Sequence, residues 1–188
     1  MYFKFNVSVR KTIAVILVAF TFFVSVGTAY AYTLLGGYWA SVNPLYYRIH
    51  PDLSTTDKSA YSASKTSWNA LGTRVFLVGK STGYKINLYA VNSSGYSWDG
   101  YTYLSPCSSC VPYTTASTYL NGYFTDAYTS GKRRSVAAHE IGHALGLGHD
   151  FGAVLMNPYT CGSESRFCTY RIYTPQEDEA YGLDALYP

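Results

Sequence analysis

Short segments of alternating or continuous apolar residues occur along much of the chain and predict a sheet. They are bounded by Gly, Pro and Asn turns, and they predict strands at 45–50, 85–91, 100–104 and 117–120. Apolar residues at helical spacing predict helices at 56–71, 132–145 and 174–186. Strands and helices are mixed early and helices dominate late, which indicates an α/β or α+β domain with one sheet and three helices.

The last predicted helix carries a clear start signal. Thr174 can cap it, Pro175 suits the first helical position, and Glu177 completes a capping box. We therefore expect this helix to begin at residue 174.

The first 31 residues have the three parts of a secretory signal peptide. Basic residues precede an apolar run from Ile13 to Val26, and Ala29-Tyr30-Ala31 then provides a small-x-small cleavage site. The run is shorter than the roughly 20 residues that a membrane span needs, and an uncleaved anchor is the alternative. We expect residues 1–31 to be a signal peptide and residues 32–188 to form a secreted, extracellular domain without a stable membrane anchor.

Composition and charge narrow the range of partners. The chain has 188 residues, a formal net charge of +3 and only 13% charged residues. Such a chain is not a polyelectrolyte, so we expect no nucleic-acid partner. Its 21 tyrosines indicate a β-rich surface of extracellular type, and we expect a monomer.

Four cysteines fit an oxidising compartment and form two close pairs, Cys107 with Cys110 and Cys161 with Cys168. Four cysteines allow three pairings, and the sequence alone does not choose among them. Nearest-neighbour pairing is the simplest expectation. The Cys107–Cys110 motif could instead be half of a zinc site or a redox motif. The chain has no second CxxC and no thioredoxin-like pattern around the first, which favours two loop-closing disulfides.

The residues with the clearest chemistry lie in His139-Glu-Ile-Gly-His-Ala-Leu-Gly-Leu-Gly-His149. A helix presents His139 and His143 on one face, where both can reach one ion at about 2.0–2.1 Å. Glu140 lies beside the first ligand and can act as a base without binding the metal. Gly146 can end the helix in a left-handed conformation, so that His149 returns to the same ion. Three protein ligands leave a fourth position open, as is typical of catalytic zinc.

This spacing is specific. With His at about 2% and Gly at about 7% of residues, the full pattern arises by chance in roughly one chain in ten thousand or fewer. The alternative is a buried helix with solvated histidines, but three of the four histidines of the chain fall in this segment. We interpret the fourth, His50, as a residue at the end of a strand.

The segment His139–His149 matches the zinc signature HExxHxxGxxH and resembles the metzincins. Met156 lies in a segment that resembles their Met-turn, in which the methionine sits under the metal. The stretch Gln176–Tyr187 is similar to the last helix of the matrixins, where Asp178 and Glu179 occupy the positions of an acidic pair. The resemblance covers most of the chain after the leader.

The resemblance implies a metzincin-like zincin fold with a twisted, mostly parallel sheet, three helices, and an upper and a small lower subdomain around a cleft. It implies one catalytic zinc ion on the three histidines and an extended peptide or protein substrate beside the edge strand. Our candidate for this edge is Thr118 to Asn121, the last strand-like segment before the zinc helix. Glu140 would take a proton from the attacking water and return it to the leaving amine.

The sequence departs from the animal matrixins at several points. The loop before the edge strand lacks the His and Asp residues that bind structural zinc and calcium there, so we expect neither a second zinc nor a strong calcium site. Asp150 stands where animal matrixins usually have Ser, and an Asp there resembles the adamalysin branch. Tyr159 lies three residues after the methionine, whereas a zinc-associated Tyr lies two after it in other branches, so a catalytic role for Tyr159 is left open.

The sequence therefore predicts a secreted zinc-dependent metalloendopeptidase. The alternative is a secreted binding protein or toxin on the same scaffold with weak or no turnover, because a fold does not fix a function. Glu140 is present, which favours the peptidase. A zinc hydrolase acting on another kind of bond has no support beyond the metal signature.

Overall fold

The computed structural model describes residues 32–188, and the predicted signal peptide lies outside them. Its five strands form one sheet in the order β2-β1-β3-β5-β4. They are β1 (Leu45–Ile49), β2 (Leu77–Gly79), β3 (Ile86–Val91), β4 (Gly100–Ser105) and β5 (Thr115–Asn121). The pairs β1–β2, β1–β3 and β3–β5 are parallel, and β4 is antiparallel to β5. The prediction of a mostly parallel sheet is thus confirmed.

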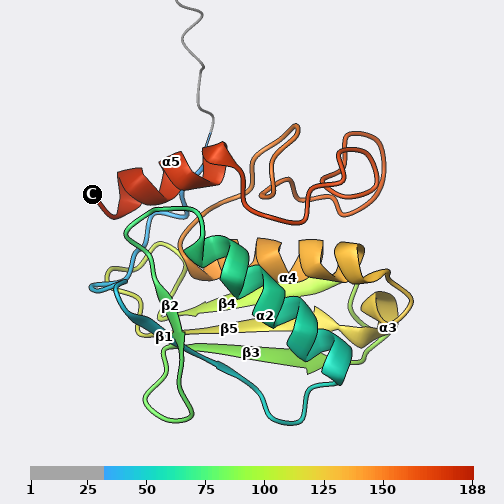
Figure 1. The fold of residues 1–188 in the computed structure, drawn as a ribbon, viewed down its shortest axis with the longest axis horizontal. Coiled ribbons are helices and arrows are strands. Elements are labelled where there is room, and N and C mark those ends of the chain that lie inside the picture. The colour runs from blue at the N-terminus through green and yellow to red at the C-terminus, as the bar shows by residue number, and fades with distance from the viewer. Residues whose placement is uncertain (1–31) are drawn as a thin grey trace, which may run out of the picture.

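Residues 32–188 contain four helices: α2 (Thr55–Asn69), α3 (Gly122–Thr125), α4 (Ser130–Ala144) and α5 (Glu177–Leu186). Helices α2 and α4 pack against each other, and α4 also packs against β4 and β5. Figure 1 shows α4 between the sheet and an irregular segment, residues 148–176, which we call the wall segment. In the described part of the chain, no helix combines the length and apolar character needed to cross a membrane.

The core lies where the sheet meets α2 and α4. Its largest fully buried apolar side chains come from both layers: Leu45, Trp68, Ile86, Leu88, Leu120 and Ile141. Burial of each such side chain contributes about 1.5–3 kcal/mol, so the two helices are held firmly on the sheet.

Polar contacts fix the positions of the two long helices. Ser54 caps α2 and Thr129 caps α4, each accepting a hydrogen bond from a backbone N–H of the first turn. A buried ion pair joins the two first turns, with Arg133 Nη1 2.8 Å from Asp57 Oδ1. Trp68 of α2 donates its indole N–H to a backbone carbonyl of α4 at 3.1 Å. Helix α4 is therefore a fixed support for the residues it carries.

The edge strand next to α4 is β4, and the prediction of 118–121 as the edge is wrong. β5 pairs with β3 on one side and with β4 on the other. Thr118 and Leu120 are fully buried, as an interior strand requires. The prediction assumed that the last strand in the sequence is also the outermost strand of the sheet. In the structure β4 precedes β5 in the sequence, but β5 lies between β3 and β4 and β4 is at the edge.

The helix at the C-terminus begins at Glu177, three residues later than predicted. Gln176 is its N-cap residue, and the Glu179 side chain accepts from the Gln176 backbone N–H at 2.7 Å. The capping box exists but lies two residues further along than the expected Thr174–Glu177 pair. Two elements, β2 and α3, were not predicted, because segments of three and four residues are too short to show a periodic pattern.

Candidate metal centre and active-site cleft

Helix α4 carries three of the predicted site residues. His139 and Glu140 are buried, at 2% and 4% exposed, and His143 lies one turn after His139 on the same face. Gly146 follows the helix with φ +103°, and a Cβ added there would come within 2.6 Å of an α5 side chain. The chain turns back at this glycine, as its position predicts, and brings His149 beside the other two histidines.

The three histidines converge through their ring nitrogens. His143 Nε2 lies 3.1 Å from His139 Nε2 and 3.1 Å from His149 Nε2. One candidate ligand atom from each histidine lies within 4.8 Å of the others, and no other cluster of His, Cys, Asp or Glu in residues 32–188 has metal-binding geometry.

Backbone carbonyls determine which nitrogens carry hydrogen in two of the rings. His139 Nδ1 is 2.9 Å from Leu155 O, and His143 Nδ1 is 2.8 Å from Leu147 O. A carbonyl oxygen can only accept, so both Nδ1 atoms donate, and in the neutral rings each Nε2 keeps its lone pair. Burial lowers the pKa of His143 to about 4 and that of His139 well below its usual value, so both rings are neutral at pH 7.

This arrangement fits a zinc ion. The Nε2 lone pairs of His139 and His143 face one another across 3.1 Å and repel unless a cation lies between them, and His149 Nε2 lies equally close to His143 Nε2. Tetrahedral zinc with Zn–N bonds of about 2.0–2.1 Å places its ligand nitrogens about 3.3 Å apart, close to the separations observed. Three neutral imidazoles with two Nδ1 atoms fixed by carbonyls are also the donor set typical of catalytic zinc.

Glu140 is held in the cleft by a residue that the sequence analysis missed. Thr102 of β4 has its hydroxyl 2.8 Å from Glu140 Oε2 and 2.9 Å from the Glu140 backbone oxygen. Burial raises the pKa of Glu140 to about 8, while the Thr102 hydrogen bond and the Arg166 charge act in the opposite direction. No local signal pointed to Thr102, because it lies far from Glu140 in the sequence.

Met156 is buried against α4 at Gly142, which lies between His139 and His143 in the sequence. It is 2% exposed, and a Cβ added at Gly142 would collide with its sulfur. The Met156 backbone N–H donates to Glu179 Oε1 at 2.9 Å, so the C-terminal helix holds this turn in place. Gly142 is therefore needed for the close approach of α4 to the turn that contains Met156.

A cleft of about 860 Å³ contains the three histidines and Glu140. β4 and the loop at 106–108 line it together with the part of the wall segment that includes Tyr159, Cys161 and Arg166. Burial is the main influence on the pKa values of the three histidines and Glu140, and the Arg166 charge lowers all four. Arg166 therefore lies close to the chemistry, although no motif identified it.

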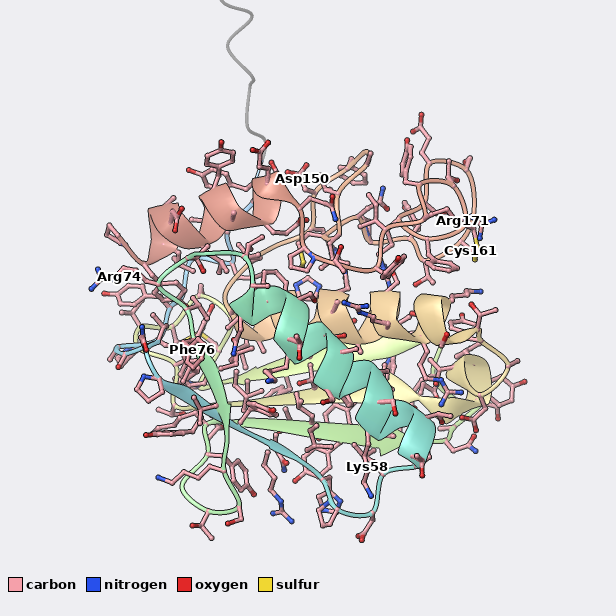
Figure 2. All side chains as sticks on the ribbon, viewed as in Figure 1. Lys58, Arg74, Phe76, Asp150, Cys161 and Arg171 are labelled. Carbon is pink, nitrogen blue, oxygen red and sulfur yellow. A yellow bond between two sulfur atoms is a disulfide. The ribbon has the colours of Figure 1, made fainter. Side chains whose placement is uncertain are left out.

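The remaining predicted residues lie around this cleft. Disulfides join Cys107 to Cys110 and Cys161 to Cys168, and Cys107 and Cys161 both line the cleft. Figure 2 shows Cys161 and Arg171 in the wall segment beyond α4. Tyr159 is 57% exposed and belongs to the cleft lining.

The mostly parallel sheet, the histidine-bearing helix α4 and the turn under it define a metzincin-like fold. The matrixin family model (peptidase M10) matches residues 79–188. Because this match spans more than half of the chain, the protein belongs to the matrixin family. Membership of this family supports the interpretation that the protein is a metalloprotease that uses zinc and acts on peptides or proteins.

Comparisons with individual proteins add to the fold only. A search of curated proteins finds no significant match. Among solved structures, the chain is similar to the GM1-bound form of the ECX AB5 holotoxin, with a TM-score of 0.50 and 17% identity over 76% of this chain and 79% of that chain. A second similar structure is high choriolytic enzyme 1, a hatching-enzyme zinc protease from Oryzias latipes (Medaka fish). Its TM-score of 0.39, with 20% identity over 60% of this chain and 50% of that chain, is too low to bear on fold or function.

Proposed function

We propose that the protein is a secreted zinc metalloendopeptidase in which His139, His143 and His149 hold one zinc ion and Glu140 is the general base. The observation that carries this proposal is the convergence of three imidazole nitrogens beside a buried carboxylate in one cleft. Membership of the matrixin family supports the same reaction class.

The residues of the cleft have distinct parts in peptide hydrolysis. Zinc bound at the histidines would supply a Lewis acid that polarises the scissile carbonyl and makes a water molecule acidic. Glu140 accepts a proton from the attacking water and returns it to the leaving nitrogen. Thr102 holds Glu140 Oε2, which leaves Oε1 for the proton. No Ser or Cys nucleophile is needed.

The proposal includes the organisation of the chain. Residues 1–31 are a signal peptide and residues 32–188 form the catalytic domain, which is released outside the cell as a monomer. Two disulfides, Cys107–Cys110 and Cys161–Cys168, support an oxidising compartment. The substrate lies extended beside β4, whose outer side pairs with no further strand in residues 32–188.

The test expresses the full chain in a secreting host. We expect secreted protein that begins at Tyr32, contains about one zinc per chain and hydrolyses casein or a mixed peptide library. A chelator should abolish hydrolysis, and added zinc should restore it. Zinc-free protein that still cleaves peptides, or zinc-loaded protein that binds peptides without cleaving any, would contradict the proposal.

A further inference from the structure

Arg166 is a buried cation in the wall of the cleft. Its side chain is among the largest fully buried ones, at 1% exposed. Its Nη1 donates to Asn157 O at 2.9 Å and to Pro158 O at 3.1 Å, and its Nη2 donates to Thr160 Oγ1 at 2.5 Å. Its Nε is buried and has no hydrogen-bond partner. The guanidinium thus keeps donor capacity that the protein does not use.

No carboxylate in residues 32–188 forms an ion pair with this cation, and although burial lowers its pKa, the charges of Asp99 and Glu140 raise that pKa from a longer distance. The ion pairs found in residues 32–188 join His50 to Asp52, and Arg133 to Asp57 and Asp126. None of them includes Arg166. A buried charge without a counterion costs several kcal/mol, and hydrogen bonds to neutral carbonyls and a hydroxyl compensate only part of that cost.

The acidic groups of the cleft are already engaged. Asp99 accepts from the Tyr128 hydroxyl at 3.1 Å, and Glu140 accepts from Thr102 at 2.8 Å. Neither lies within the 4 Å of an ion pair with Arg166. Asp99 and Glu140 therefore act on Arg166 only from a distance, and a carboxylate that enters the cleft would be the first anion in direct contact with the guanidinium.

We propose that Arg166 makes the cleft select substrates with an aspartate or glutamate side chain next to the scissile bond. This inference rests on the proposed peptidase function, because the cleft that Arg166 lines also contains the histidines and Glu140. A carboxylate that reaches the guanidinium gains a charge-assisted hydrogen bond, whereas a lysine or arginine side chain is repelled.

The wall around Arg166 supports this choice over an apolar residue. The guanidinium is surrounded by the carbonyls of Asn157 and Pro158 and the hydroxyl of Thr160, and Cys161–Cys168 closes the loop that contains it. These three groups already accept from Arg166, and an aliphatic substrate side chain would bury against the cation without pairing with it. Hydrogen bonds to charged groups contribute about 1.5–3 kcal/mol, which corresponds to a preference on the order of tenfold or more.

The first test uses the wild-type protein. Cleavage sites in a mixed library define a parent peptide, which is then made with Glu, Gln, Leu or Lys at each position flanking the scissile bond. We expect kcat/KM for Glu to exceed that for isosteric Gln by about tenfold at one of the two positions, with Lys the poorest. Equal rates for Glu and Gln, or a preference for Leu or Lys, would overturn the inference while leaving the peptidase intact. Failure to cleave any peptide would instead contradict the proposed function.

The second test removes the charge. In Arg166→Gln, the ratio of kcat/KM between the Glu and Gln peptides should fall to about one, and this ratio does not depend on the folded fraction. Arg171→Gln is the matched control, because Arg171 lies in the same wall segment, is exposed, and stacks over Phe167 instead of lining the cleft. Its ratio should match the wild type. An unchanged ratio in Arg166→Gln overturns the inference, and if that variant does not fold, the wild-type peptide series decides alone.

Discussion

Helix α4 and the wall segment contribute to the same cleft, but they are held in different ways. In α4 the backbone N–H and C=O groups bond to one another, and helical periodicity alone puts His139 and His143 on one face. The wall segment has no helix or strand, so its buried backbone groups need other partners. Asn157 provides several: its side-chain amide donates to the carbonyls of Gly152 and Glu164 and accepts from the Tyr159 N–H.

The position of the site residues and the shape of the pocket therefore depend on different kinds of contact. The positions of His139, Glu140 and His143 depend on a regular element that α2 and the sheet hold in place, whereas His149 lies at the start of the wall segment. The shape and charge of the pocket depend on a few individual side chains, above all Asn157 and Arg166. We therefore expect changes in α4 or at His149 to determine whether peptides are cleaved, and changes in the rest of the wall segment to determine which peptides are cleaved.

The largest expected effect comes from Glu140 on α4, the proposed general base. Glu140→Gln keeps the shape of the side chain but cannot accept the proton, so kcat should fall by about 1,000-fold. Zinc content, measured by elemental analysis, should stay near the wild-type value because Glu140 is not among the three proposed ligands. Loss of zinc together with activity would mean that this role is wrongly assigned, and wild-type turnover would remove Glu140 from the mechanism.

The next largest expected effect is a loss of stability when the buried ion pair between α2 and α4 is broken. Asp57→Ala leaves Arg133 without its closest carboxylate in a buried position, so the free energy of unfolding should fall by about 3 kcal/mol. Urea denaturation measures this change. Asp52→Ala is the control, since Asp52 is 87% exposed and lies 3.7 Å from His50, and its loss should change stability by less than about 1 kcal/mol. Equal effects of the two substitutions would show that the buried pair does not hold the helices.

Thr102 gives a smaller effect that is specific to Glu140. Thr102→Val removes the hydroxyl that holds Glu140 Oε2 while keeping the side-chain volume. We expect kcat to fall about tenfold with little change in KM, as for other residues that orient a catalytic group. Thr102→Ser should restore most of the rate, since it retains the hydroxyl. A change confined to KM, or no rescue by Ser, would show that Thr102 acts on substrate binding or packing instead.

The sequence predicted the candidate site best where the site residues lie on a helix with a periodic pattern. Helix α4 was predicted at 132–145 and spans 130–144, and the signature within it placed His139 and His143 on one face with Glu140 beside the first of them. The edge strand was wrongly predicted because the order of strands in a sheet is not encoded in the local pattern. The start of α5 was misplaced because Glu179 caps that helix while also accepting from Met156, a contact formed only in the folded chain.

Thr102 and Arg166 could not be found in the same way. Thr102 meets Glu140 from β4, across 38 residues of sequence, and a lone Thr in a strand carries no chemical signature. From the sequence, Arg166 would be expected at the surface, because it stands in a polar loop. Its burial becomes visible only in the folded wall segment. Both acquire their significance from the tertiary arrangement of the cleft, which a single sequence does not reveal.

The smallest expected effect distinguishes the two disulfides. Each closes a short loop, so each should contribute about 2–3 kcal/mol to stability at most. Replacing Cys107 and Cys110 by Ser should chiefly lower the melting temperature, because the Tyr113 hydroxyl, which donates to Ser108 O at 2.6 Å, still holds that side of the cleft. Replacing Cys161 and Cys168 by Ser loosens the loop around Arg166, although the Arg166–Thr160 hydrogen bond remains.

We therefore expect kcat/KM to fall by about threefold to fivefold in the Cys161/Cys168 variant and by less in the Cys107/Cys110 variant, since a looser wall positions the substrate less well. Peptide kinetics and melting curves on the two double variants measure both quantities. Peptide mapping of the unreduced protein tests the pairing itself. A larger loss of kcat/KM in the Cys107/Cys110 variant would reverse the assignment, because it would make the loop beside β4, rather than the wall segment, the part of the cleft that positions the substrate.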